Sequence, residues 1–67
     1  MPGASDLDVL RVAALVIKDH SAGAIDYATG READLLAKRD VDGAVMWRRV
    51  VRAIERLQAA EPGGGKH

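Results

Sequence analysis

The chain of 67 residues contains no cysteine and no phenylalanine, and it has a single tryptophan and a single tyrosine. Without cysteine it can form neither disulfides nor thiolate metal sites. Ten basic and ten acidic residues cancel, so no overall electrostatic field draws the chain to nucleic acid or to an anionic membrane. No apolar run reaches the ~18 residues of a membrane span, and the first residues do not resemble a signal peptide. We therefore expect a cytoplasmic protein with no membrane partner.

Hydrophobic residues make up 48% of the chain, but much of this share is alanine and valine. Such small side chains bury little area each. A single core in a chain below ~70–80 residues rarely supplies more than ~3–5 kcal/mol. Either the helices pack unusually well, or a second copy of the chain or another protein covers apolar surface that the monomer leaves exposed, and we favour self-association.

The clearest secondary-structure signal lies in residues 41–60. Apolar side chains, among them Trp47, Val50 and Ile54, recur at helical spacing on one side of this segment. Alternation in a β-strand would not separate them from the arginines, which share the opposite side. Asp40 has the side chain of a helix N-cap. The pattern predicts a helix whose Trp47 side closes a small core. The arginines on its outer side are Arg48, Arg49, Arg52 and Arg56.

A first helix is predicted for residues 6–19, with Ser5 as its N-cap and Asp8 completing a capping box. Its apolar residues cover more than half of the helical wheel, which is more than one neighbouring helix can bury. This helix is therefore either the centre of the domain or an oligomer surface. Leu10 and Ile17 are the candidate contact residues on it.

A second helix is predicted for residues 22–38, with Ser21 as the residue that caps it. Gly30 lies inside this helix at a cost of ~1 kcal/mol, which suggests either close approach of another helix or a bend there. Arg31 and Asp34 are expected to form an ion pair with each other, or to reach Asp42 or Glu55 of the third helix. Arg39 stands where a left-handed residue, usually glycine, ends a helix.

These segments predict an all-α, compact three-helix domain. The helices span about residues 6–19, 22–38 and 41–60, and a very tight turn at Arg39-Asp40 joins the second to the third. Residues 1–5 form a flexible arm, residues 6–60 a single helical domain, and residues 61–67 a disordered tail rich in glycine.

Several motifs occur in a familiar order: His20 after the apolar residues 13–17, then Ala24 and Ala28, residues 31–36, residues 40–44 and Trp47-Arg48-Arg49-Val50. This order resembles a family of small uncharacterised proteins, found mainly in alphaproteobacteria, with an H-G…R-A-D-x-L…G-D-x-x-G-x-x-x-W-x-x-I pattern. Here Ser21, Glu32 and Arg39 replace that pattern's glycine, alanine and glycine. The resemblance covers about residues 9–57. It implies a small helical domain of unknown function, and it carries no activity, cofactor or site.

The four arginines of the third helix are the most suggestive functional set. They could hold phosphates or an acidic protein surface, or they could form a solvated helix face. Nucleic acid is disfavoured as a partner, because the chain is neutral and Asp40 and Asp42 lie at the end of the helix that would enter a groove. Trp47 is interpreted as a core residue, with an interface role as the alternative.

No catalytic, cofactor or metal site is indicated. His20 is a single histidine without a second ligand at metal-binding spacing, and we interpret it as a helix C-terminal residue. The sequence contains neither a nucleophile–base set nor a glycine-rich phosphate loop. We therefore expect a small interaction or scaffold module that self-associates through the first helix. A regulator that contacts nucleic acid or an acidic partner through the arginines is the alternative, and an enzyme is disfavoured.

Overall fold

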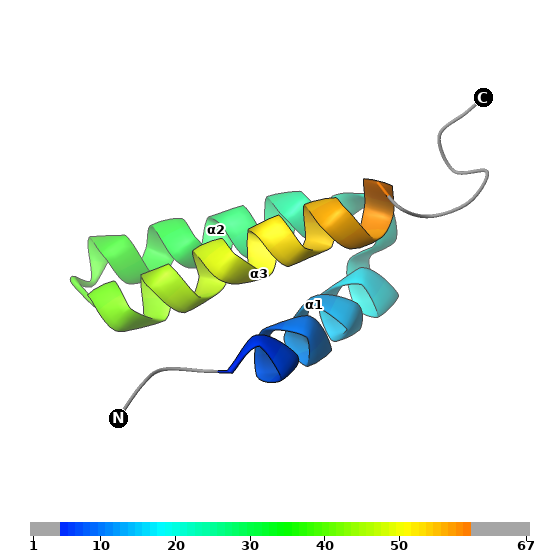
Figure 1. Cartoon of the computed structure of the whole chain (residues 1–67). Coiled ribbons are helices and arrows are strands. Elements are labelled where there is room, and N and C mark those ends of the chain that lie inside the picture. Colours follow the sequence, from blue (N-terminus) through cyan, green and yellow to red (C-terminus); the bar gives the residue numbers. More distant parts are fainter. Residues whose placement is uncertain (1–4, 60–67) are drawn as a thin grey trace.

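The computed structural model describes residues 5–59, which are helical apart from short caps and turns (Figure 1). Helix α1 spans Asp6–His20, the 3-10 turn η1 spans Ser21–Gly23, α2 spans Ala24–Ala37 and α3 spans Val41–Ala59. The all-α class is confirmed for these residues. Most of the predicted arm, the predicted tail and the predicted last residue of the third helix lie outside the described residues.

The two strongest helix starts are where the sequence predicts them. The Asp8 N–H donates to Ser5 Oγ over 3.2 Å, and this bond caps α1. The Gly43 N–H donates to Asp40 Oδ1 over 3.0 Å, and this bond caps α3. Each oxygen satisfies a backbone donor that has no partner within the first turn of its helix. Both predicted N-caps are confirmed.

Helix α2 begins at Ala24, two residues later than predicted, because the chain first forms η1. Ser21 does not cap α2 with its side chain. Its backbone N–H donates to the Ile17 carbonyl and ends α1, at a φ of 49° and a ψ of −117°. Gly30 was expected at a close helix crossing or a bend. The close crossing is wrong, because no atom beyond the neighbouring backbone of α2 lies within 4 Å of the site of an added Cβ, and α2 is continuous through Gly30.

The turn between α2 and α3 is closed by backbone hydrogen bonds. The Asp40 N–H donates to the Leu35 carbonyl over 2.8 Å, and the Arg39 N–H donates to the Leu36 carbonyl over 3.0 Å. This pair of bonds defines a Schellman motif, which needs a left-handed residue at Arg39. The φ of Arg39 is 63°, so the predicted left-handed residue is confirmed. Helix α2 ends one residue earlier than predicted, at Ala37.

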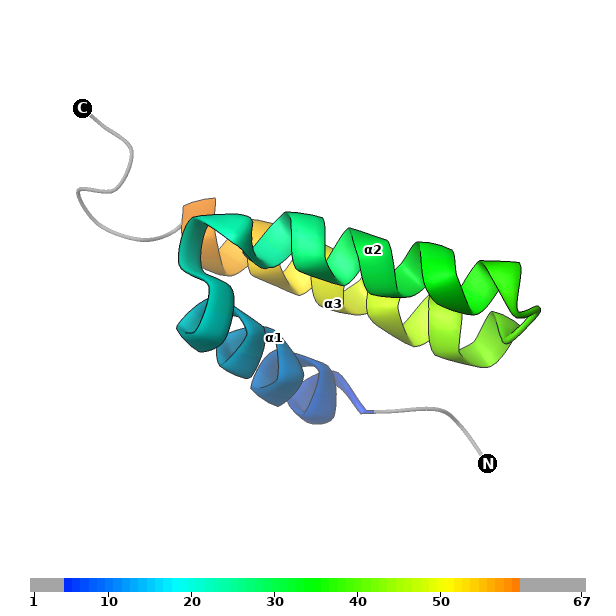
Figure 2. The ribbon, with the colours of Figure 1, turned by 180° about the vertical axis from the view of Figure 1, so that it is seen from behind.

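Helices α2 and α3 form an antiparallel hairpin, and α1 packs against one half of it (Figures 1 and 2). The first residue of α1, Asp6, contacts Arg49, and Ser21 just after α1 contacts Gln58. Helix α1 therefore lies beside the C-terminal half of α3. The other end of the hairpin, with the Arg39 turn, extends beyond the start of α1.

The core is built from small side chains. The largest fully buried residues are Ile54 and Val50, and the full set of buried residues is Val9, Ala13, Val16, Ala24, Ala28, Ala44, Val50, Ala53 and Ile54. None of the six leucines is in this set. Only one narrow stripe of α1 is buried, so the interpretation of this helix as the centre of the domain is wrong. Five alanines lie in the core, whereas each leucine is half-buried or exposed.

Candidate protein-interaction surface

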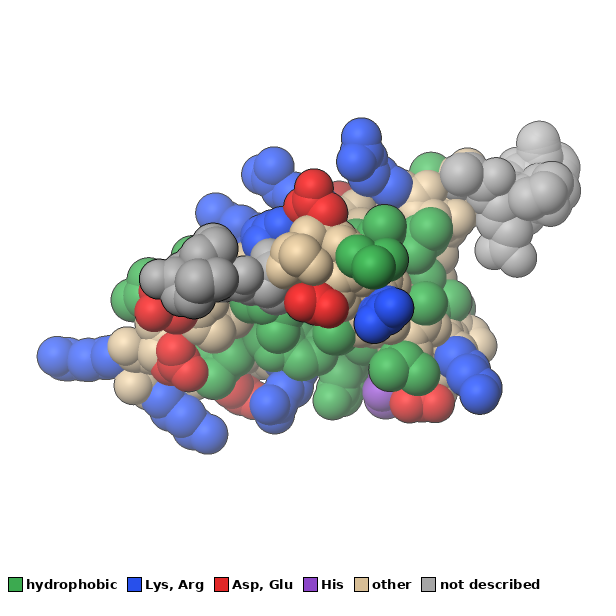
Figure 3. Space-filling view, turned by 60° about the horizontal axis from the view of Figure 1, so that its bottom comes forward, with side chains coloured by type: hydrophobic (Ala, Val, Ile, Leu, Met, Phe, Trp, Pro, Cys, Tyr) green, Lys and Arg blue, Asp and Glu red, His purple; other side chains and the backbone are tan. Residues whose placement is uncertain are grey.

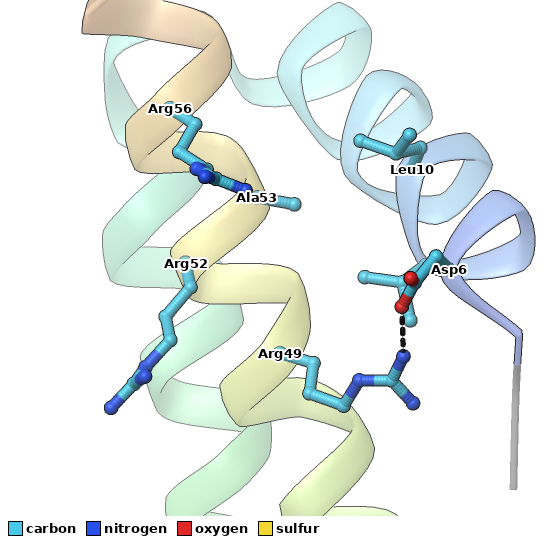
Figure 4. A pocket seen from close by; sticks show the side chains of 7 residues that line it. Asp6, Leu10, Arg49, Arg52, Ala53 and Arg56 are labelled. Atoms are coloured by element: carbon cyan, nitrogen blue, oxygen red, sulfur yellow. Dashed lines mark hydrogen bonds and ion pairs between the residues drawn. The ribbon is translucent and has the colours of Figure 1, made fainter.

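A groove of about 350 Å³ lies between α1 and the C-terminal half of α3 (Figure 4). Val9 and Leu10 of α1 and Ala53 of α3 form its apolar lining. Its charged lining consists of Asp6, Arg49, Arg52 and Arg56. The sequence suggested a leucine side of the first helix and an arginine side of the third as two separate hypotheses. The structure brings Leu10 and three of the four arginines to one groove.

Two of the predicted arginines bind neighbouring helices. Arg49 Nη2 lies 2.6 Å from Asp6 Oδ1 at the start of α1. Arg48 Nε lies 3.3 Å from Glu32 Oε2 on α2, on the other side of the hairpin. The second pair gives the Glu32 side chain of α2 a basic partner on α3. The Arg49–Asp6 pair is exposed and contributes only ~0–1 kcal/mol, whereas in the Arg48–Glu32 pair the glutamate side chain is only 17% exposed.

Arg52 and Arg56 make no ion pair or hydrogen bond with any residue in the range 5–59. Arg56 turns toward α1 and the groove, whereas Arg52 points away from α1 (Figure 4). Both also line a more open hollow along α3 with Glu55 and Ala59. Two guanidinium groups with ten N–H donors between them are therefore available to an external acceptor.

The two candidate contact residues of the first helix have different positions. Leu10 is 45% exposed and points toward α3 from the edge of the groove (Figure 4). Leu7 lies one helical turn earlier, is 57% exposed, and extends the apolar surface outward. Ile17 is only half-buried at the surface and packs against the core. Leu7 and Leu10 are therefore the better probes of an interface.

Trp47 lies at the edge of the core, in a row of rings that the sequence did not predict. Its ring makes an edge contact with Tyr27 at 6.1 Å, and Tyr27 stacks on His20 at 4.1 Å between centroids. Arg31 lies 5.8 Å from the Trp47 ring centre. The expected ion pair of Arg31 with Asp34 or with α3 is absent among the described residues. The three rings belong to α1, α2 and α3, so a periodic pattern within one helix could not have predicted that they contact one another.

Hydrophobic side chains cover much of the face that includes α1, and acidic and basic side chains lie among them and around the margin (Figure 3). A partner that buries leucines gains ~25 cal/mol for each Å² of apolar area removed from water. The arginines can add charge-assisted hydrogen bonds to carboxylates. The surface suits a partner segment that is both apolar and acidic.

In the range 5–59, no group of three histidine, aspartate or glutamate side chains could hold a metal ion. No helix in that range is long and apolar enough to cross a membrane. No protein-family model, curated protein or solved structure matches the chain.

Proposed function

We propose that this protein is a small interaction module, rather than an enzyme, and that it self-associates through the exposed side of α1. The observation that carries the proposal is the exclusion of all six leucines from the core. A core of mostly alanine and valine supplies little hydrophobic stabilisation. Leu10 lines a groove where a second chain can cover it, together with the exposed Leu7 one turn earlier on α1. The net charge of zero means that copies of the chain do not repel one another as a whole.

Light scattering over a tenfold range of concentration tests this proposal. The wild type should have a mass above the 7.1 kDa of one chain, and the mass should rise with concentration. The double variant Leu7→Glu/Leu10→Glu should remain near 7.1 kDa, because carboxylates would have to be buried in the interface. Far-ultraviolet circular dichroism should show that the variant retains its helices.

The matched control is Leu36→Glu, because Leu36 is 52% exposed and lies near the far end of the hairpin. This variant should associate like the wild type. A wild type that stays at the monomer mass throughout would contradict self-association. Dissociation by Leu36→Glu alone would place the contact on the hairpin end instead of α1.

A second candidate function is the binding of an acidic protein or a nucleic acid through Arg52 and Arg56. The observation in its favour is that neither arginine makes an ion pair with a described residue. The double variant Arg52→Gln/Arg56→Gln should keep the fold, because both side chains are exposed. It should weaken binding to a fluorescent polyglutamate peptide or DNA duplex if this function holds, and the loss should diminish at high salt.

We also propose membership of the alphaproteobacterial family that the sequence resembles. The support is conformational. Ser21 and Arg39 are the non-glycine residues with positive φ in the described part of the chain. They occupy two of the three positions at which the family pattern has glycine, the residue that adopts positive φ most readily, and Gly43 keeps the third.

A further inference from the structure

The exposed side of α1 carries a short apolar strip that begins in the groove. At about 100° per residue, Leu10, Ala14 and Leu7 follow one another over about 60° of the helix, and all three are exposed. Asp6, which binds Arg49 of α3, lies about 40° to the other side of Leu10. Leu10 is therefore the member of the strip nearest to α3, where it lines the groove, and Leu7 is the farthest (Figure 4).

Basic side chains flank this strip on both sides. On the α3 side, Arg49, Arg52 and Arg56 line the groove. On the other side, Lys18 and Arg11 of α1 are exposed and lie about 20–40° beyond the outer end of the strip. Arg49 binds an aspartate, and the other four make no ion pair or hydrogen bond with any residue in the range 5–59. We call these five residues the basic rim.

The chain as a whole is neutral, but this surface is not. Asp6 is the one acid in the groove lining, and it is already bound to an arginine. Asp8 and Asp19, the remaining acids of α1, lie about 160–180° around the helix from Leu10. Glu55 of α3 lines the neighbouring open hollow rather than the groove. Five basic side chains and one acid therefore border the apolar strip, which makes the surface complementary to a partner that is both anionic and apolar.

The two sides of the basic rim extend in the same direction. Helices α1 and α3 are parallel, because the start of α1 contacts Arg49 and its end contacts Gln58, later in α3 (Figure 1). Each side of the rim extends over about seven residues, which is about 10 Å of helix. A helix laid along the groove can therefore place an apolar face about 100° wide on the strip and carboxylates beside both sides of the rim.

We propose that the groove and the basic rim dock an acidic amphipathic helix of another protein. This inference rests on the proposed function as an interaction module and names the chemistry of its partner. The concave shape of the groove favours a helix over the flat surface of a bilayer, and the leucines favour an amphipathic partner over a wholly acidic one. Two copies of this chain that meet through Leu7 and Leu10 bring two basic rims together, and like charges oppose that contact. The acidic helix should therefore displace a second copy from α1.

Fluorescence anisotropy with a labelled peptide tests the docking site. The probe has the 15-residue length of α1, with leucines at helical spacing on one face and glutamates on both flanks. It should bind the wild type at least about tenfold more tightly than a polyglutamate of the same length, because only the probe buries the leucines. Added salt should weaken this binding and strengthen self-association, because it screens attraction in the first contact and repulsion in the second. In light scattering, excess probe should reduce the wild type to single chains with bound peptide.

Two matched variants locate the contact. Arg11→Gln/Lys18→Gln removes the two charges of the rim that lie on α1, and it should weaken binding of the probe by about three- to tenfold. Lys38→Gln/Arg39→Gln removes the same charge from the exposed turn between α2 and α3, and it should bind like the wild type. Glutamine has good helix propensity, so circular dichroism should show an unchanged helix content in both variants.

The outcomes separate this inference from the proposed function. A wild type that self-associates but binds the probe no better than polyglutamate would overturn the acidic helix and leave self-association standing. Equal losses in the two variants would show attraction by net charge alone and would also overturn it. Binding to vesicles of phosphatidylglycerol in place of the probe would assign the surface to a membrane and overturn the inference. A monomeric wild type that binds the probe with the expected pattern would support the docking site and contradict self-association alone.

Discussion

The half of the α2–α3 hairpin that α1 covers and the half that extends beyond it are stabilised differently. In the covered half, Val50 and Ile54 are fully buried against small residues of α1 and α2. In the uncovered half, Leu36, Val41 and Val45 are more than half exposed. That half is held by the Schellman bonds, by the Asp40 cap and by the Arg48–Glu32 ion pair.

This difference shows that the packing of one helix against part of a hairpin leaves the two parts of a small domain stabilised by different interactions. Helix α1 supplies hydrophobic burial only where it lies against the hairpin. Beyond its first residue, local hydrogen bonds define the geometry of the turn, but each contributes only ~0.5–1.5 kcal/mol. The covered half should therefore be sensitive to the loss of side-chain volume, and the uncovered half to changes in the backbone.

The largest expected effect is that of Ile54→Ala in the covered half. Removal of this fully buried side chain should cost ~2–5 kcal/mol, which is comparable to the whole stability of a domain of this size. The variant should be largely unfolded in urea titrations followed by circular dichroism. The matched change Val45→Ala, at an exposed site in the uncovered half, should alter stability by less than ~0.5 kcal/mol. A similar loss from both variants would mean that the hairpin end is also covered in solution.

Glycine at the two positive-φ positions should give the next largest effects, and both should be stabilising. Ser21 combines a φ of 49° with a ψ of −117°, which strains any residue with a Cβ, so Ser21→Gly should gain ~1–3 kcal/mol. Arg39 has a φ of 63° in a left-handed region that is less strained, so Arg39→Gly should gain ~1 kcal/mol or slightly less. The midpoint temperature of thermal unfolding should rise by about 4–8 °C for each kcal/mol of added stability. An unchanged midpoint in either variant would show that the positive φ is not maintained there.

Alanine at the two helical glycines should have effects no larger than that of Arg39→Gly, with a gain at one site and none at the other. Gly30 is open to solvent, so Gly30→Ala should gain ~1 kcal/mol from helix propensity. At Gly43 an added Cβ would lie 2.9 Å from Asp40 Oδ2 and 3.1 Å from Leu35 Cδ1, so Gly43→Ala should disturb the cap and give no gain. Urea midpoints measured at one protein concentration compare the two. An equal gain at both sites would show that the Asp40 cap can adjust without loss.

Local signals explain which parts of the fold could be predicted. Ser5 and Asp40 act within one helical turn, so the sequence indicates them directly, and Arg39 was recognised because of its place between two helical patterns. Ser21 was misassigned because serine is usually an N-cap, whereas here its backbone ends the preceding helix. Gly30 was misinterpreted because a sequence does not show which side of a helix another helix approaches.

The candidate surface could be predicted only in part. Leu10 is predicted because the apolar arc of the first helix is wider than one neighbour can bury, and the arginines are predicted because helical periodicity places them opposite the apolar side of the third helix. Their convergence on one groove depends on the packing of α1 against α3, as does the separation of Arg48 from the other arginines. Ile17 shows the limit of periodicity, since a wide apolar arc does not reveal which of its edges the core covers.

The sequence by itself determined the helices, two of their caps and the left-handed turn, because these features depend on bonds between residues a few positions apart. Only the tertiary structure decided that alanine fills the interior, that leucine remains outside, and that Leu10 and Arg56 share a groove. Those outcomes depend on the angle and extent of contact between whole helices. Small alanine side chains permit close helix contact, and a 15-residue α1 beside a 19-residue α3 leaves part of the hairpin uncovered.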